Sequence, residues 1–347
     1  MNSNLTRPIR ILLILFLANM VLFVLNLFSG SVFIPADDIL SILFSSNTTL
    51  ASGYDLIILQ SRLPQTITAL LTGAALSVAG LLLQTLFRNP LAGPGILGVS
   101  AGASLGVAVM TLIGGLGTSF LISDALQQYG VILAAFLGAF LSLSLVLLFA
   151  TFVKNNISLL IIGMMVGYAV SSMIGFLQFI GHQQQVHAFV IWGLGSFSHV
   201  TADELPLYAV LVFFGVFISF LFVKPLNALL LGENYAANLG VKVKQTRTAL
   251  ILISGLLTAV ATAYAGPIAF IGLAVPHLTR MSFRTSDHKV LLPALVLMGM
   301  AIALACNLIA RLPALEQAIP INIVTSIFGA PLVIWFLVKN NKIKMYS

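Results

Sequence analysis

The side chains that could take part in the widest range of chemistry are the five histidines, because the chain has one cysteine and only nine acidic side chains. They are His182, His187, His199, His277 and His288. His182 and His187 enclose three glutamines, and such a pair could touch an iron-bearing ligand. Their spacing matches no metal-binding motif, and ordinary histidines in a polar loop are the commoner case. With no phosphate-binding glycine loop and no nucleophile–base pair, the sequence predicts no enzyme, no cofactor and no resident metal.

Ionisable side chains are also missing from the middle of the long apolar segments. The 347 residues are 59% apolar and 7% charged, whereas a soluble domain has about 25% charged residues. Composition therefore predicts a polytopic helical membrane protein. Its basic residues stand singly at segment ends, which does not indicate nucleic-acid binding. Ion- and proton-coupled carriers usually place ionisable groups at mid-membrane, so their absence predicts that energy for transport arrives from the cytoplasmic face.

Ten segments predict membrane spans of about 20 residues each. They are residues 11–28, 63–87, 95–115, 131–153, 157–180, 205–223, 248–264, 268–280, 290–310 and 319–338. With the N-terminus inside, fourteen of the sixteen basic residues fall on the inner side and only Arg62 and Arg311 fall outside. Most acids fall outside. This asymmetry follows the positive-inside rule and predicts cytoplasmic N- and C-termini on a single transmembrane domain, residues 1–347.

Several segments interrupt the plain helical pattern. Residues 88–95 contain two prolines and cannot be helical throughout. A second Pro/Gly break at 265–267 lies five spans later, which would relate the two halves as inverted repeats. Short helices are expected at 35–44 and 189–197 on the outer face. Rows of small residues four apart predict close helix packing in the third and fifth spans; they are Gly98, Gly102 and Gly106, and then Gly163, Gly167, Ser171 and Gly175.

Residues 225–247 form the longest polar interruption in the C-terminal half. Leu226, Leu229 and Leu230 would share one face of a helix. Gly232 breaks that run, and residues 233–239 predict a second short helix that ends at Gly240. The charge asymmetry places this segment in the cytoplasm. Two short helices with apolar side chains predict a docking element for a cytoplasmic partner, and the alternative is a solvated loop with interfacial leucines.

Short motifs throughout the chain resemble those of one transporter family. They are LPQ at 63–65, TGAAL at 72–76, RNPLA at 88–92, PGILGVSAGA at 94–103, LGE at 231–233, GPIAFIGL at 266–273, PH at 276–277 and GAP at 329–331. In this order they resemble the FecCD-type permeases, the membrane subunits of ATP-driven ABC importers for iron-siderophores, haem and cobalamin. The resemblance implies the type II ABC importer permease fold, all-α with ten transmembrane helices, in the inner membrane of a prokaryote.

The resemblance also implies a set of partners. These are a second permease protomer, in a homodimer or close heterodimer, two cytoplasmic ABC ATPase subunits and an external substrate-binding protein. ATP hydrolysis would belong to the ATPase. The substrate would be a metal chelate, with an iron-siderophore complex favoured and haem or cobalamin as alternatives.

Two other classes of transport protein fit the sequence less well. A secondary carrier would need intramembrane ionisable groups, and a channel would not need the docking segment.

Family roles carry over to matching positions. ATPase coupling is implied for Leu231, Gly232, Glu233, Ala237, Leu239, Gly240 and Arg247. Docking of the binding protein is implied for Arg62 and Arg311, and the alternative is that both simply extend to the interface near helix ends. Gln65 stands where the family often has a second basic residue. The turn between the fourth and fifth spans matches an inner gate, which implies that role for Asn156 and Ile157.

Overall fold

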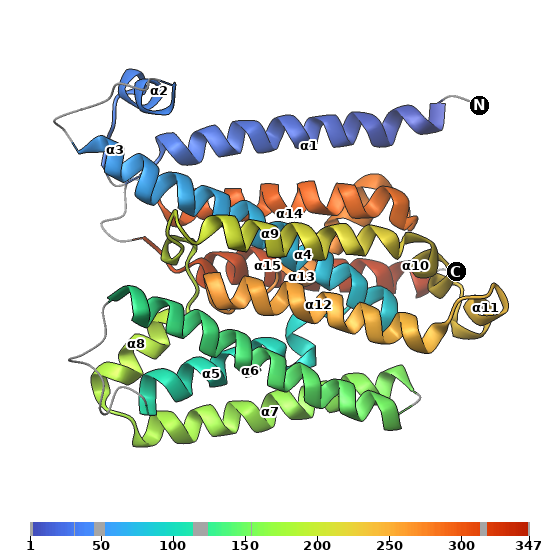
Figure 1. Cartoon of the computed structure of the whole chain (residues 1–347). Helices are drawn as coiled ribbons and strands as arrows, with labels where there is room; N and C mark the ends of the chain where they lie inside the picture. The colour runs from blue at the N-terminus through green and yellow to red at the C-terminus, as the bar shows by residue number, and fades with distance from the viewer. Residues whose placement is uncertain are drawn as a thin grey trace.

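A computed structural model describes residues 3–30, 32–44, 53–113, 124–153, 155–312 and 318–345, and all regular structure within these ranges is helical (Figure 1). The elements are α1 Ser3–Phe28, α2 Ala36–Phe44, α3 Tyr54–Leu56, η1 Ile57–Arg62, α4 Leu63–Leu86, η2 Pro94–Leu97, α5 Val99–Ala108, η3 Val109–Ile113, α6 Asp124–Phe152, α7 Asn156–Ile180, α8 Gln183–Gly193, η5 Phe197–His199, α9 Leu205–Leu221, α10 Val223–Leu230, α11 Glu233–Asn238, α12 Val243–Ala265, α13 Ile271–Phe283, α14 His288–Ala310 and α15 Ile321–Met345. Two charges used for the topology, Lys154 and Glu316, lie outside the described residues.

Each of the ten predicted spans contains a helix, so the all-helical class is confirmed. Within the described ranges, six helices are long and apolar enough to cross a membrane, and α9 with α10, bent by 56°, would make a seventh. The other three predicted spans correspond to α5 with η3, α13 and α15, whose apolar parts are shorter. The exact number of ten spans stays a prediction.

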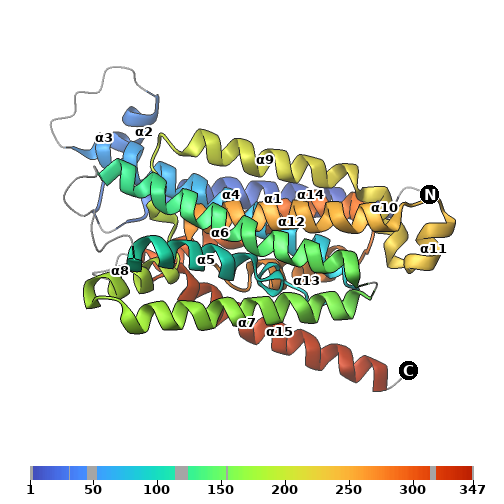
Figure 2. The same cartoon turned by 60° about the horizontal axis from the view of Figure 1, so that its bottom comes forward.

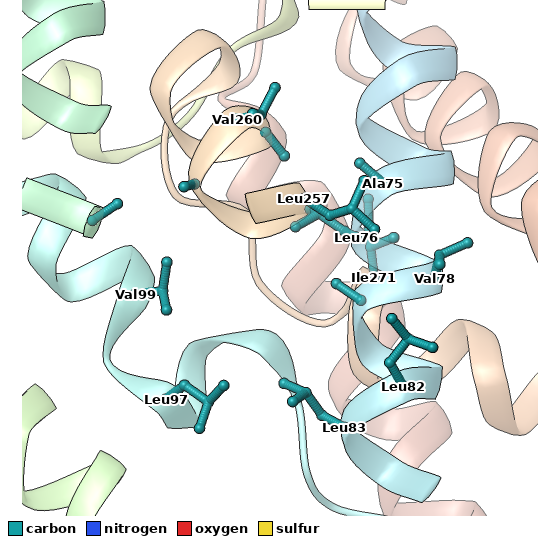
Figure 3. Packing of buried hydrophobic residues seen from close by; sticks show 14 of the residues in the cluster. Ala75, Leu76, Val78, Leu82, Leu83, Leu97, Val99, Leu257, Val260 and Ile271 are labelled. Atoms are coloured by element: carbon teal, nitrogen blue, oxygen red, sulfur yellow. The ribbon is translucent and has the colours of Figure 1, made fainter. Parts of the chain in front are cut away.

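Helix α4 is the centre of the fold. Twenty of its 24 residues are buried, and it packs against α9, α12, α13 and α14. Figure 3 shows Leu76 of α4 facing Leu257 of α12 and Ile271 of α13. Helices α5, α6, α7 and α8 form a second group that joins this core through α12 (Figure 1). By contrast, α1 and α7 leave most of their apolar side chains exposed, as expected for lipid-facing helices.

Glycine lets α4 and α13 cross with their backbones in contact. A Cβ added to Gly80 would lie 1.7 Å from the Gly272 carbonyl oxygen. The predicted row in the third span behaves in the same way, since Cβ atoms on Gly102 and Gly106 would meet α6 backbone at 2.5 and 1.9 Å. The row in the fifth span is only partly a packing row, because Gly175 faces open space. Small residues thus set the helix spacing, as expected within a membrane.

The two Pro/Gly breaks lie against each other. A Cβ added to Gly272 would come within 2.5 Å of the Pro94 ring, and the lining of a cavity of about 350 Å³ includes residues 93–96, 267–270, 272 and 273. A cavity shared by corresponding segments of the two halves agrees with such a repeat. The inverted relation between the halves stays a prediction.

The two ends of the molecule carry different elements. Figures 1 and 2 place the start of α1 and the end of α15 at the same end as α10 and α11, and α2, α3 and α8 at the opposite end. This arrangement agrees with the prediction that both termini share one side with the segment 225–247. Which side of a membrane that is rests on the charge asymmetry alone.

Gly80→Val should prevent correct packing, because the new side chain would overlap the backbone of Gly272. We expect a loss of stability of at least about 3 kcal/mol, the upper range for overpacking. Gly175→Val, with open space around it, is the matched control. The measurement is the yield of monodisperse protein and its apparent melting temperature in detergent. Equal behaviour of the two variants would contradict the close crossing of α4 and α13.

Candidate functional site

The segment 225–247 folds as two short helices, as predicted. The chain bends by 56° after α9 into α10, and α11 follows after Gly232. Gly232 has φ 113° and ψ 155°, a backbone conformation that is essentially restricted to glycine. It is buried beside the Arg88 guanidinium. Gly240, with φ 84°, follows the end of α11 as a C-terminal glycine should.

The exposed apolar side chains of this segment are not the ones that the leucine spacing predicted. Leu226 and Leu229 are 0% and 3% exposed and pack α10 onto the protein body. The expectation that they belong to a docking face is therefore wrong, because α10 must bury one side to be held in place. The exposed apolar side chains are Leu231, Tyr235 and Leu239, at 62%, 51% and 60%. Leu231 stands at the end of α10, Tyr235 within α11 and Leu239 directly after α11, and we call these three exposed side chains the exposed apolar row.

Two further predicted coupling residues lie beside this row. Ala237 and Gly240 are exposed, whereas Ala236 is fully buried. A cavity of about 430 Å³ opens between α10 and the start of α12, and its lining includes Leu239, Lys224 and Lys242. The hairpin formed by α10 and α11 therefore presents apolar side chains next to a basic groove. Such a surface suits an acidic protein cleft with an apolar floor.

Glu233 holds the base of α11. Its Oε1 accepts a hydrogen bond from Asn156 Nδ2 at 2.6 Å and pairs with Arg247 Nη2 at 3.4 Å. Asn156 Nδ2 also donates to the Leu86 carbonyl at 3.0 Å, and Arg247 Nη1 donates to the Val153 carbonyl at 3.2 Å. Both carbonyls lie at helix ends, where backbone acceptors lack intrahelical partners. Three predicted site residues from different segments thus meet in one cluster.

The second residue predicted for the inner gate lies outside this cluster. The Ile157 side chain is exposed, and its backbone N–H donates to the Asn155 side chain at 2.9 Å, which caps the start of α7. Ile157 is adjacent to Asn156 in the chain but contributes no polar contact to Glu233. The gate assignment for both residues stays a prediction.

The base of α10 is held by a second polar cluster, which the sequence did not indicate. Asn227 Oδ1 accepts from the His288 Nδ1 and backbone N–H groups at 2.7 and 2.9 Å, and Asn227 Nδ2 donates to Asp287 at 2.6 Å. His288 Nε2 accepts from the Thr85 hydroxyl at 2.8 Å. The Lys289 backbone N–H and the Asn227 amide lower the pKa of Asp287 below its usual value. The available signal was Asp287 immediately before a span, the pattern of a helix N-cap.

At the opposite end, Arg62, one of the two predicted docking residues, is buried. It is 1% exposed. Its Nη1 donates to the Leu27 and Phe28 carbonyls at 2.8 and 3.1 Å, and its Nη2 donates to the Val32 carbonyl. The guanidinium therefore caps the C-terminal end of α1 instead of facing solvent. The carbonyls at the end of α1 take up its donors, and the docking role of Arg62 stays a prediction.

Arg311 follows directly after α14 and is half-buried. Burial, with the nearby charge of Arg62, lowers the pKa of Arg311 to about 10. Its buried Nη1 has no hydrogen-bond partner among the described residues. Gln65 is a packing residue: it donates to Asn307 at 3.1 Å, and Asn307 donates to Asn26 at 2.8 Å. These buried amides join α4, α14 and α1.

The two histidines singled out in the sequence do not act as a pair. His187 lines a cavity of about 540 Å³ with His199, Trp192 and Tyr264. His182 is outside that lining and stands at the N-terminal end of α8. Burial lowers the pKa of His199. The described residues contain no group of three His, Cys, Asp or Glu side chains that could hold a metal ion.

Arg62→Ala should destabilise the protein, because three carbonyls around the end of α1 would lose a charged donor. We expect a loss of about 3 kcal/mol, in line with hydrogen bonds to a charged group. Arg311→Ala, which removes a side chain with fewer partners, should change stability by about 0.5 kcal/mol or less. The measurement is thermal unfolding of the purified variants. If Arg62→Ala left the melting temperature unchanged and weakened only the binding of an external protein, the capping role would be wrong.

Comparison with known proteins tests the family predicted from the motifs. The family model described as the FecCD transport family matches residues 16–339. The hemin transport system permease protein HmuU of Yersinia pestis is 33% identical over 285 residues, which cover 82% of this chain and 84% of that protein. The vitamin B12 import system permease protein BtuC of Klebsiella pneumoniae is 35% identical over 321 residues, covering 92% and 91%.

The fold has a solved counterpart. A structure described as an inward-facing conformation of an ABC transporter of metal-chelate type matches with a TM-score of 0.79 and 32% identity, covering 94% of this chain and 99% of that one. The family model, the relatives and the fold agree over nearly the whole chain. The chain therefore belongs to the FecCD transport family.

Proposed function

We propose that this chain is the permease subunit of an ATP-driven importer of metal chelates in the inner membrane of a prokaryote. Ten spans would cross the membrane, with both termini and the α10–α11 hairpin in the cytoplasm. ATP hydrolysis would take place in partner subunits and not in this chain. The FecCD family and the relatives, which are named as haem and vitamin B12 permeases, support the proposal.

The exposed apolar row on the hairpin is the observation that carries this proposal. Leu231, Tyr235 and Leu239 are more than half exposed, and α11 lies at one end of the molecule (Figure 1). The same hairpin is attached at its base to α4, α7 and α12 through the Glu233 cluster. An element with exposed apolar side chains and fixed contacts to three helices can bind a partner and transmit the partner's movement to those helices. We assign two ABC ATPase subunits as that partner, one for each protomer of a dimer.

Transport would proceed by rigid-body alternation. When the ATPase pair closes on ATP, each hairpin would be displaced, and the cluster at Glu233 would pass that displacement to the starts of α7 and α12. Asn156 lies at the start of α7 and donates to the end of α4, so movement there would open or close the inner side of the path. Packed helices switch between discrete arrangements in this way.

An external binding protein would deliver the substrate to the opposite end. With Arg62 buried, Arg311 is the remaining basic residue that the sequence places on that face. Iron-siderophore complexes are the proposed substrate, and haem and cobalamin are the alternatives. The apolar spans, without ionisable groups at mid-length, suit a large chelate that is bound weakly on its way through.

Leu239→Arg should weaken association with the ATPase, because a charge would replace an apolar anchor. Anchor residues at interfaces contribute about 2 kcal/mol or more, so the affinity should fall about 30-fold. Leu239→Met keeps an apolar side chain and is the matched control. The measurement is co-purification of the ATPase with the permease, followed by titration in nanodiscs. Unchanged affinity in Leu239→Arg would rule out the hairpin as the docking element.

The substrate class is tested by uptake in a strain that lacks this gene. Restoring the chain should restore uptake of radio-iron supplied as a ferric siderophore, and substitution of the Walker lysine of the partner ATPase should abolish it. Restored uptake of haem or of cobalamin instead would transfer the assignment to that alternative. Uptake that survives loss of the ATPase but stops with an uncoupler would show a secondary carrier.

A further inference from the structure

We infer that Thr85, His288 and Asn227 form a positioning bridge that makes α10 move as one body with the end of α4 and the start of α14. The inference rests on the proposed function, since it concerns how a displacement of the hairpin reaches the spans. These residues come from three separate parts of the chain, at sequence separations of 203 and 61. None belongs to the coupling motif from which the sequence predicted a site.

The geometry defines each hydrogen bond of the bridge. Asn227 donates to the Asp287 carboxylate and accepts from the His288 backbone N–H, so its amide orientation is set from both sides. Its oxygen can only accept, and therefore His288 Nδ1, 2.7 Å away, must carry a proton. In the neutral ring Nε2 is then an acceptor, and the Thr85 hydroxyl donates to it at 2.8 Å. The three side-chain hydrogen bonds are therefore all donated in the same direction, from Thr85 towards Asp287.

The hydrogen bonds of this bridge are directional, unlike apolar contacts, and burial makes them costly to break. His288 and Thr85 are 1% and 2% exposed. Leu226 and Leu229 also hold α10 against the body, but apolar contact is non-directional and permits sliding. A buried polar group that loses its partner is destabilised, so any sliding of α10 along α4 or α14 would be opposed. The bridge therefore sets the position of α10.

Two routes from the hairpin converge on the last turn of α4. Asn227 of α10 reaches Thr85 through His288. Glu233 of α11 reaches the Leu86 carbonyl through Asn156. The same turn extends the connection to α13, because Gln84 accepts from Arg280 at 2.7 Å. Displacement at either hairpin helix would thus arrive at residues 84–86 of the most buried helix.

The test uses the complete transporter in proteoliposomes, with its ATPase and binding protein, and measures substrate moved per ATP hydrolysed. Thr85→Val has nearly the same shape as the native residue but lacks the donor, and Asn227→Leu lacks the amide. Each should lower the ratio of transport to hydrolysis about fivefold or more, the range of typical coupling between sites. The double variant should be no worse than either single variant, because both break one bridge.

Two controls separate this role from a general loss of structure. Thr85→Ser keeps the hydroxyl and should keep the ratio. Thr248→Val removes an exposed hydroxyl that donates within its own helix, to the Lys244 carbonyl, and should also keep the ratio. As a readout independent of transport, hydrogen exchange of the purified permease should speed up in α10 of Thr85→Val and remain unchanged in α7.

Several results would overturn the inference. They are a parallel loss of transport and hydrolysis, additive effects in the double variant, equal behaviour of Thr85→Ser and Thr85→Val, or unchanged exchange in α10. If no ATPase associated with the native chain, the proposed function would fail and the coupling role with it, and the exchange experiment would then report only a local structural bridge. If only the inference about the bridge were wrong, the native protein would still bind its ATPase and take up substrate.

Discussion

The burial of α4 is the constraint on which the rest of this structure depends. A helix surrounded on all sides must approach its neighbours closely, and small residues along α4 allow this. Gly73 meets Gly299 of α14, and Gly80 meets Gly272 of α13. In lipid, apolar burial gives no preference between a neighbouring helix and a lipid tail, so close backbone packing has to hold the helices together. Helices that lie farther from α4 are free to expose apolar side chains.

Several charged and amide side chains in this protein lie where helices end, and there they hydrogen-bond to backbone carbonyls. Arg62 caps α1, Asn156 caps α4, and Arg247 caps α6. A carbonyl at a helix end has no partner within its helix, and where it is shielded from solvent it needs a protein donor. A side chain used in this way also joins two elements. The requirement to satisfy backbone groups therefore also builds the connections between the hairpin and the spans.

The same requirement explains why one end of the molecule suits coupling and why Arg62 is buried at the opposite end. At the hairpin, α10 and α11 satisfy their polar groups at the base and leave Leu231, Tyr235 and Leu239 exposed at the tip. At the other end, α1 finishes close to the start of α4, and its carbonyls draw Arg62 inward. A cation that the hydropathy pattern places at a span end can therefore be structural.

Local pattern in the sequence was sufficient for the elements and for the position of the hairpin. Hydropathy, proline and glycine act within a few residues, so the helices, the break at 88–95 and the two short helices around Gly232 could be predicted. The family followed from motifs for the same reason. Which face of α10 is buried, where the Arg62 guanidinium points and how Asn227 meets His288 and Thr85 were decided by tertiary structure. Those outcomes depend on partners up to 203 positions away in the chain, and no periodicity within one segment encodes them.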